Sequence, residues 1–276
     1  MRDSLRVFMV HGVSHADDVA SGPWRERWQE ALLESARRAG FDEPSRIDVG
    51  FASFDAIFDD FPLDPGTIAR GLWILTRDAL GPPPTRAEIE ALAAFETARW
   101  TAGMVIQWIE NPRLREALAA SVLEQWRAFA PDAVCAHSLG SLACYDAARR
   151  CLASGDDAPL RGCDLVTFGS QVAHPALRSA IGAVSPLHAP GNGPGVRQWM
   201  HLFNPRDHVF TRPLAIGDER THSLVTAFDI PGDGLNHDGA HYLAHRVMSR
   251  RVLPAILTRG PAGPHLRDVS RRLPVA

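Results

Sequence analysis

The chain contains no lysine. All 29 of its basic residues are arginines, and 32 acidic residues leave a formal net charge of −3 at pH 7. The absence of lysine excludes a lysine nucleophile and a lysine Schiff base. The near balance of charge provides no basic surplus for binding nucleic acid or an anionic membrane surface. We therefore expect neither of these partners.

Cysteine is scarce, and long hydrophobic runs are missing. The four cysteines stand in apolar or helical contexts without C-x-x-C spacing, which predicts buried free thiols typical of a reducing compartment: Cys135, Cys144, Cys151 and Cys163. No apolar run approaches the length of a membrane span. Residues 1–4 lead directly into a short apolar stretch without the layout of a signal peptide. We expect a cytoplasmic protein with no transmembrane segment.

The order of apolar segments indicates the fold class. With 276 residues, of which 45% are hydrophobic, the chain can bury the core of one large α/β domain. Short apolar runs alternate with helical patterns, which predicts parallel β-α-β units and a mostly parallel, doubly wound sheet. The expected strands are 5–10, 47–51, 133–136, 164–168 and 198–203, and the expected helices are 24–38, 114–130, 139–153 and a last one from 240 or 242 to 258. Residues 223–228 fit either a further strand or a helix start.

One segment departs from this alternation. Residues 56–112 combine several prolines with many large apolar side chains, and 87–109 has a helical pattern. We predict a helical insertion in a single α/β domain that spans 1–258. The insertion fits an ordinary packed subdomain as well as an apolar cap over a substrate pocket. The Pro- and Arg-rich residues 259–276 are expected to form a loosely held tail.

Ser138 stands between the expected strand 133–136 and the expected helix 139–153. A serine on such a strained strand-to-helix turn is typical of a nucleophile elbow. The pinched backbone requires small residues two positions before and after the serine, and Ala136 and Gly140 occupy these positions. The match is A-x-S-x-G instead of the full G-x-S-x-G, and by itself it fits a plain strand–turn–helix equally well.

A serine nucleophile needs a base and a group that orients the base. Asp207 directly follows the strand 198–203, at the end of the strand where α/β sheets collect catalytic groups, although the same residues could form an exposed turn. His237, in the loop before the last helix, has the position expected for the base. His241, near the start of that helix, is the alternative base.

The same histidines also suggest a rival, a zinc site, because a spacing of four residues places His237, His241 and His245 on one face of a helix. Asp207 or Asp238 could then complete a metallohydrolase site. Gly239 and the loop 231–234 count against a helix through His237, and Asp238 stands where the H-E-x-x-H motif has glutamate. We therefore expect no metal.

An oxyanion hole must accompany the serine. In this architecture one donor is the backbone N–H of the residue after the nucleophile, here Leu139. The other comes from the loop after an early strand, where His11, Gly12 and Val13 follow the strand 5–10. We assign the second donor to Val13, with Gly12 allowing a close approach of the backbone to the substrate.

Four separated stretches together resemble the α/β-hydrolase superfamily of serine esterases and lipases. They are Val-Phe-Met-Val-His-Gly at 7–12, Ala-His-Ser-Leu-Gly-Ser at 136–141, Asn-Pro-Arg-Asp-His-Val-Phe at 204–210, and His-Asp at 237–238 followed by Tyr-Leu at 242–243. The last two are similar to an uncharacterised bacterial branch of lipase-like hydrolases. The resemblance implies Ser138, Asp207 and His237 as the catalytic triad and His245 as a supporting residue. Ala136 and Ser141 replace glycines that many lipases carry.

The expected function is that of a serine hydrolase which cleaves a carboxylic ester, small or lipid-like, through an acyl-enzyme on Ser138, without a cofactor. Two alternatives remain at this point. The same triad could serve an acyltransferase or a thioesterase, because these differ only in which molecule reaches the acyl-enzyme. A non-catalytic α/β-hydrolase fold could instead act as a binding protein.

Overall fold

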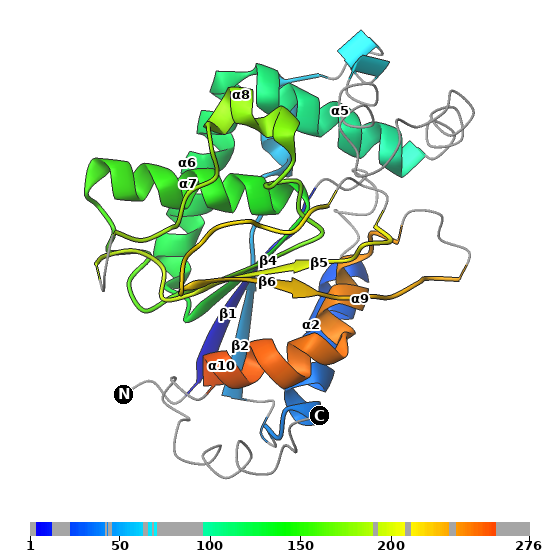
Figure 1. Cartoon of the computed structure of the whole chain (residues 1–276), viewed down its shortest axis with the longest axis vertical. Helices are drawn as coiled ribbons and strands as arrows, with labels where there is room; N and C mark the ends of the chain where they lie inside the picture. The colour runs from blue at the N-terminus through cyan, green and yellow to red at the C-terminus, as the bar shows by residue number, and fades with distance from the viewer. Residues whose placement is uncertain are drawn as a thin grey trace.

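A single parallel sheet forms the centre of the computed structural model, which describes residues 4–12, 23–41, 43, 46–62, 66–67, 69–70, 96–189, 193–207, 211–231 and 236–257. Its six strands lie in the order β2-β1-β3-β4-β5-β6, and every neighbouring pair is parallel (Figure 1). The strands are β1 (Leu5–Val10), β2 (Ile47–Phe51), β3 (Ala133–His137), β4 (Asp164–Phe168), β5 (Trp199–Phe203) and β6 (Thr221–Val225). The predicted parallel α/β fold is confirmed, and the ambiguous segment near 223 forms the edge strand β6.

Helices cover both faces of the sheet. On one face lie α5 (Glu96–Glu110), α6 (Pro112–Phe129), α7 (Leu139–Ser154) and the short α8 (Arg178–Ile181), and on the other lie α2 (Pro23–Arg38), α9 (Gly239–Ala244) and α10 (Leu253–Leu257) (Figure 1). The remaining turns are the 3-10 helices η2 (Asp55–Asp60) and η3 (Pro175–Leu177) and the π-helical turn η4 (Met248–Val252). The sheet is therefore doubly wound.

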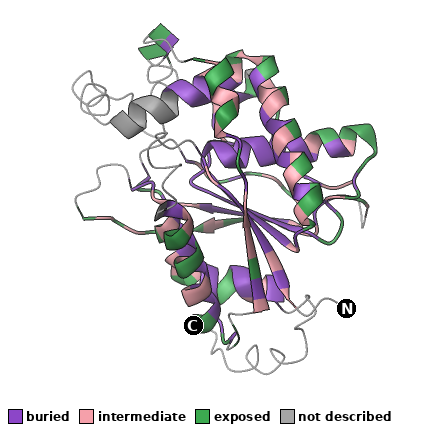
Figure 2. Ribbon diagram, turned by 180° about the vertical axis from the view of Figure 1, so that it is seen from behind, coloured by how far each residue is buried: buried purple, intermediate pink, exposed green. Residues whose placement is uncertain are grey.

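The two faces of the sheet belong to two hydrophobic cores. In β1, Phe8 and Val10 join the core beneath α6 and α7, whereas Val7 and Met9 join the core beneath α2 and α10. Successive side chains of a strand point to opposite faces, so both must be apolar when both faces are covered. Figure 2 shows the buried strands between helices whose outward sides are exposed. This explains why the strands appear in the sequence as continuous apolar runs.

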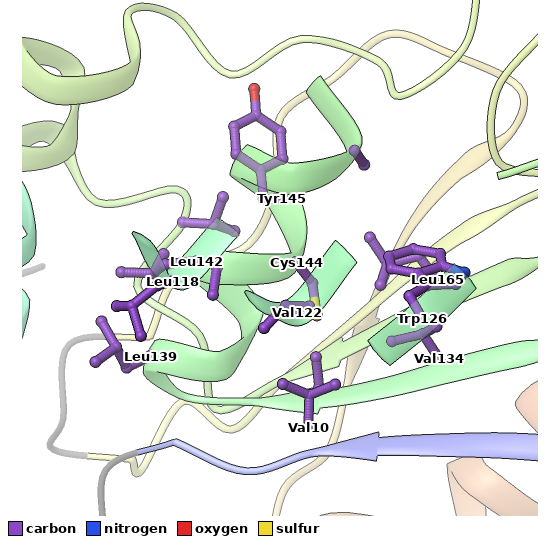
Figure 3. Packing of buried hydrophobic residues seen from close by; sticks show 14 of the residues in the cluster. Val10, Leu118, Val122, Trp126, Val134, Leu139, Leu142, Cys144, Tyr145 and Leu165 are labelled. Atoms are coloured by element: carbon purple, nitrogen blue, oxygen red, sulfur yellow. The ribbon is translucent and has the colours of Figure 1, made fainter. Parts of the chain in front are cut away.

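Helix α7 is buried along most of its length. Eleven of its residues are buried, from Leu139 to Cys151. Figure 3 shows Leu142 of α7 beside Leu118 of α6, and Cys144 of α7 beside Val122 of α6, above the sheet. Burying one such side chain stabilises the fold by roughly 1.5–3 kcal/mol. The helix that follows Ser138 is thus fixed by packing on several sides.

The order of the strands contains one reversal. From β1 the chain adds β2 on one side of the sheet, and then adds β3, β4, β5 and β6 on the other side. In open α/β sheets, ligands bind beyond the carboxyl ends of the strands at such a switch point. Here the switch lies between β1 and β3. Gly12 and Ser138 follow the carboxyl ends of these two strands.

The last helix differs from the prediction of one continuous helix up to 258. Helix α9 ends at Ala244, and His245 has an extended backbone with φ −66° and ψ 145°. The His245 ring accepts a hydrogen bond from the N–H of Val247 at 3.2 Å, so it caps the helical segment that follows. The residue at this break is a histidine that caps the next segment, so the usual signals of a helix end, glycine or proline, are missing from the sequence here.

Helix α5 lies within the predicted insertion 56–112. Helix α5 corresponds to the predicted helix 87–109, of which 87–95 lie outside the described residues. Met104, Val105 and Trp108 of α5 belong to the same core as α6 and α7. The predicted tail, 259–276, also lies outside the described residues. In the part of the chain that is described, no helix has both the length and the apolar character needed to cross a membrane.

The cysteines are free and buried, as predicted. Burial raises the pKa of the Cys135 thiol to about 12, because the interior disfavours a thiolate. The pKa of Cys144 is raised for the same reason. A thiol of this kind is inert near neutral pH. None of these four side chains is therefore suited to act as a nucleophile.

Candidate active site

Ser138 occupies the turn between β3 and α7. Its backbone has φ 52° and ψ −128°, a conformation that residues other than glycine rarely adopt. Holding a residue in such a region costs about 1–3 kcal/mol, and the cost is tolerated where surrounding structure imposes it. Here the Ser138 N–H donates to the carbonyl of Phe168 at 3.1 Å, and the Ser138 carbonyl accepts from the Ser141 N–H at 2.9 Å. The expected strained turn is present.

Two glycines allow β1 to pass close to this turn. A Cβ on Gly140 would lie 2.4 Å from the carbonyl oxygen of His11 and 2.6 Å from that of Val10. A Cβ on Gly12 would lie 2.7 Å from the Cβ of Ser138. Contacts this short do not occur between real side chains and backbone, so both positions require glycine. The small residue expected at 140 therefore has a steric cause in the path of β1.

The His237 ring lies between Ser138 and Asp207. Its Nε2 is 3.0 Å from the Ser138 Oγ, and its Nδ1 is 2.8 Å from Oδ2 and 3.0 Å from Oδ1 of Asp207. A carboxylate only accepts hydrogen bonds, so Nδ1 carries the proton and Nε2 is free to accept from the serine hydroxyl. Residues that are 30 and 99 positions apart in the chain thus form one continuous chain of hydrogen bonds.

All three residues are buried. Ser138 is 3% exposed, Asp207 is 7% exposed and His237 is 9% exposed. Hydrogen bonds between partly charged groups are stronger where water is excluded. The arrangement can therefore withdraw a proton from the Ser138 hydroxyl and hold the resulting imidazolium against a carboxylate.

Two asparagines, neither of them among the predicted site residues, position the loops that carry the acid and the histidine. Asn204 accepts the Arg206 N–H at its Oδ1, and its carbonyl accepts the Asp207 N–H at 3.0 Å, which closes the turn after β5. Asn236 has φ 53°, and its side chain donates to the Arg206 carbonyl at 3.2 Å. Asn236 thereby joins the residue before His237 to the residue before Asp207. At 236 the signal in the sequence is the residue type itself, because asparagine tolerates the left-handed conformation that the loop requires there.

The structure brings His237, and not His241, to Ser138. Asp238 caps α9 by accepting the Ala240 N–H at 2.8 Å, and it also pairs with Arg27 of α2. The Nδ1 of His241 lies 3.5 Å from Asp238, and its side chain is 45% exposed.

The three histidines of the suggested zinc site therefore do not converge. His237 bonds to Ser138 and Asp207, His241 lies beside Asp238, and His245 caps the next helical segment. Among the residues that the structure describes, no group of three or more His, Cys, Asp or Glu side chains could hold a metal ion.

His137 forms a neutral surface beneath the His237 ring. The two rings have their centroids 4.5 Å apart, and Phe168 and Trp28 pack around His137. Burial lowers the pKa of His137 well below its usual value, and the neighbouring rings of His237 and His11 lower it further. His137 therefore stays uncharged near neutral pH and places no second positive charge beside His237.

Of the two expected oxyanion donors, Leu139 and Val13, the structure describes only Leu139. Leu139 is the first residue of α7, and an N–H at this position has no carbonyl partner within its own helix. The positive end of the helix dipole adds to its ability to bind an anion. Val13 lies outside the described residues, so its assignment remains a prediction.

Two surface pockets lie away from this site. One of about 450 Å³ includes Asp132 and Gly162, and one of about 420 Å³ includes Gly162 and Arg197. These residues precede β3, β4 and β5, so the pockets lie at the amino ends of the strands, opposite Ser138. Arg197 pairs there with Asp164.

Comparison with known proteins identifies no relative. No family model matches the chain, and neither the curated proteins nor the solved structures contain a significant match.

Proposed function

We propose that this protein is a serine hydrolase of the α/β-hydrolase type that cleaves a carboxylic ester through an acyl-enzyme on Ser138. One observation carries the proposal: the hydrogen-bonded chain from the Ser138 Oγ through His237 to Asp207, with Ser138 on a strained turn at the switch point of the sheet. A structural serine would require neither the strained backbone nor a buried imidazole backed by a carboxylate.

In the first half of the reaction, the Ser138 Oγ attacks the carbonyl carbon of the ester. Its proton passes to Nε2 of His237, over the 3.0 Å that separates the two atoms. Asp207 holds the Nδ1–H and stabilises the imidazolium. The oxyanion is bound by the N–H of Leu139 and by that of Val13. His237 then gives its proton to the leaving alcohol, and the acyl group remains on Ser138.

In the second half, water attacks the acyl-enzyme and His237 takes a proton from it. The tetrahedral intermediate collapses, the carboxylic acid leaves, and the proton returns to the Ser138 Oγ. No cofactor takes part in these steps.

We infer that the ester carries an apolar acyl group, because the side chains packed behind the nucleophile turn are apolar. Leu139, the residue after the nucleophile, packs in an apolar cluster with Met104, Val105 and Trp108 of α5 and with Phe54. These side chains are buried, and a polar or charged acyl group that entered such a region would lose hydration without gaining partners.

Activity-based labelling with a fluorophosphonate probe tests the proposal. Labelling of the wild type should be abolished in Ser138→Ala and retained in Ser141→Ala, which removes a hydroxyl that only donates to the Ala136 carbonyl at 2.7 Å. His237→Ala should lower the labelling rate by roughly 10²–10⁴-fold, the usual contribution of general acid–base catalysis. His241→Ala is the matched histidine control and should leave it unchanged.

Two results would contradict the proposal. Labelling that persists in Ser138→Ala would show another nucleophile, and the absence of both labelling and turnover of p-nitrophenyl esters would indicate a binding protein. If esters are turned over, the products formed with added alcohols and thiols distinguish hydrolysis from acyl transfer and thioester cleavage.

A further inference from the structure

Tyr242 lies behind the carboxylate of Asp207. Its side chain is fully buried, and its hydroxyl is 2.7 Å from Oδ2 of Asp207. The backbone N–H of Asn204 donates to the same hydroxyl oxygen at 3.2 Å. A phenol has one proton and a carboxylate only accepts, so the Tyr242 O–H donates to Asp207. The direction of this hydrogen bond is therefore fixed.

The tyrosine and the histidine share one carboxylate oxygen. Oδ2 of Asp207 accepts from Tyr242 and lies 2.8 Å from Nδ1 of His237. Hydrogen bonds to a charged acceptor are strong, and burial strengthens them further. Burial and the nearby charge of Asp207 raise the pKa of Tyr242 well above its usual value, so the hydroxyl keeps its proton at the pH values at which His237 acts.

The ring of Tyr242 is held independently of its hydroxyl. Phe228 packs edge-on against it with centroids 4.8 Å apart, and Phe168 packs against it at 5.8 Å. The ring belongs to the core beneath α2 and α10. Replacing Tyr242 with phenylalanine therefore removes the hydroxyl while leaving the apolar contacts in place.

We propose that Tyr242 is a positioning residue for the His237 base, acting through Asp207. Its hydroxyl keeps Oδ2 turned toward Nδ1 and takes up part of the negative charge of the carboxylate. This inference rests on the proposed hydrolase function and names a residue for it beyond the serine, the histidine and the aspartate.

The charged and titratable groups around His237 come from several elements. The described ones are Asp207 after β5, Tyr242 on α9, His137 at the end of β3 with His11 beyond it, and Asp238, which is engaged with Arg27 of α2 and the cap of α9. Among these described groups, Tyr242 contacts Asp207 and can lose its hydroxyl without a change of charge. Tyr242 is thus the position at which the effect of a neighbour on His237 through Asp207 can be tested.

Tyr242→Phe tests this inference, with Tyr145→Phe as its matched control. The chain has only these two tyrosines. Tyr145 is equally buried, packs on Trp199, and accepts the Ser185 N–H at 3.1 Å, away from the triad. We expect Tyr242→Phe to lower kcat for an ester by about tenfold, a fraction of the roughly 10²–10⁴-fold that general acid–base catalysis contributes. Tyr145→Phe should not change kcat.

The pH profile distinguishes positioning from a general loss of structure. Without the tyrosine, Asp207 holds the protonated imidazole more strongly, so the acid limb of kcat/KM should move to higher pH in Tyr242→Phe and not in Tyr145→Phe. The titration midpoint of the His237 ring, followed by NMR of histidine-labelled protein, should move in the same direction. Unchanged profiles and midpoints in Tyr242→Phe would overturn the inference.

A double-mutant cycle tests the route through Asp207. If Tyr242 acts through the carboxylate, Tyr242→Phe should cause no measurable further loss of activity in an Asp207→Ala background. A full additional tenfold loss there would overturn the inference while leaving the proposed hydrolase intact. A wild type that is neither labelled nor active would refute the hydrolase, and the NMR midpoints would still decide whether Tyr242 acts on His237.

Discussion

Gly140→Ala is the substitution for which the structure predicts the largest effect from the smallest change. The added methyl group would lie 2.4 Å from the His11 carbonyl oxygen, about 1 Å short of the 3.4 Å at which ordinary contact begins, and 2.6 Å from the Val10 carbonyl oxygen. Both obstacles are backbone atoms at the end of β1, which pairs with β2 and β3. They cannot move aside as a flexible side chain could.

The expected magnitude follows from this geometry. Overpacking a core typically costs 1–3 kcal/mol, and an obstacle made of sheet backbone puts Gly140→Ala near the upper end, at about 3 kcal/mol. The higher helix propensity of alanine returns at most about 1 kcal/mol. A net loss of about 2 kcal/mol would lower Tm by roughly 4–8 °C in a chain of this size. Displacing Ser138 by about 1 Å from His237 should slow labelling by about 10²-fold.

Thermal unfolding and the rate of fluorophosphonate labelling measure these two effects. Gly217→Ala is the matched control, because a Cβ there meets nothing within 4 Å and its φ is not in the left-handed region. Gly12→Ala, whose Cβ would meet Ser138 itself at 2.7 Å, should slow labelling with a smaller effect on Tm. If Gly140→Ala has the same Tm and the same labelling rate as Gly217→Ala, the end of β1 does not lie as close to the turn at Ser138 as described.

Two further predictions concern stability. Asp164→Ala should destabilise the protein by about 3–5 kcal/mol in urea unfolding, because Asp164 is fully buried and its loss leaves the guanidinium of Arg197 without this carboxylate. The control is Asp48→Ala, which removes a half-exposed carboxylate paired on the surface. It should cost no more than about 1 kcal/mol. Burial lowers the pKa of His201 to about 4, against 6.5 for a free histidine, so the unfolded chain binds the proton more readily between these values. The free energy of unfolding should therefore fall by about 2 kcal/mol from this residue as the pH drops from 7 to 5, and it should fall by correspondingly less in His201→Asn. An equal fall in the variant would contradict the lowered pKa of His201.

The sequence alone predicts several strands of the sheet with accuracy. The expected strands 5–10, 47–51 and 164–168 match β1, β2 and β4 to the residue. Strands β1 and β4 are buried on nearly their whole length, so their apolar runs begin and end where the sheet does, whereas the edge strand β2 is only partly buried. The helices of the same core, α6 and α7, also begin within two residues of their expected starts. Helix α6 begins at Pro112, two residues before the expected start, with Asn111 as its cap, and α7 begins directly after Ser138, as expected.

Contacts between distant segments were not predictable in the same way. Asn236 connects the loop before His237 to the carbonyl of Arg206, 30 residues earlier, and Tyr242 reaches Asp207 across 35 residues. Nothing in the local pattern around an asparagine or a tyrosine reports such a partner. The strand order is likewise not reported by any local pattern in the sequence. That β1 lies beside β3, which brings Gly12 against Ser138, is decided by how the helices cover the two faces and not by any single segment.

The choice between His237 and His241 shows how a single helix start determines the site. Asp238 is the N-cap of α9, so His237 precedes the helix and its ring can turn back toward the carboxyl ends of β3 and β5. His241 and Tyr242 lie inside the helix, where successive side chains point about 100° apart. With Tyr242 facing Asp207 in the core, His241 must face outward, and its side chain is 45% exposed beside Asp238. The helix can supply the tyrosine or the histidine to Asp207, but not both, and the buried ring of Tyr242 decides which.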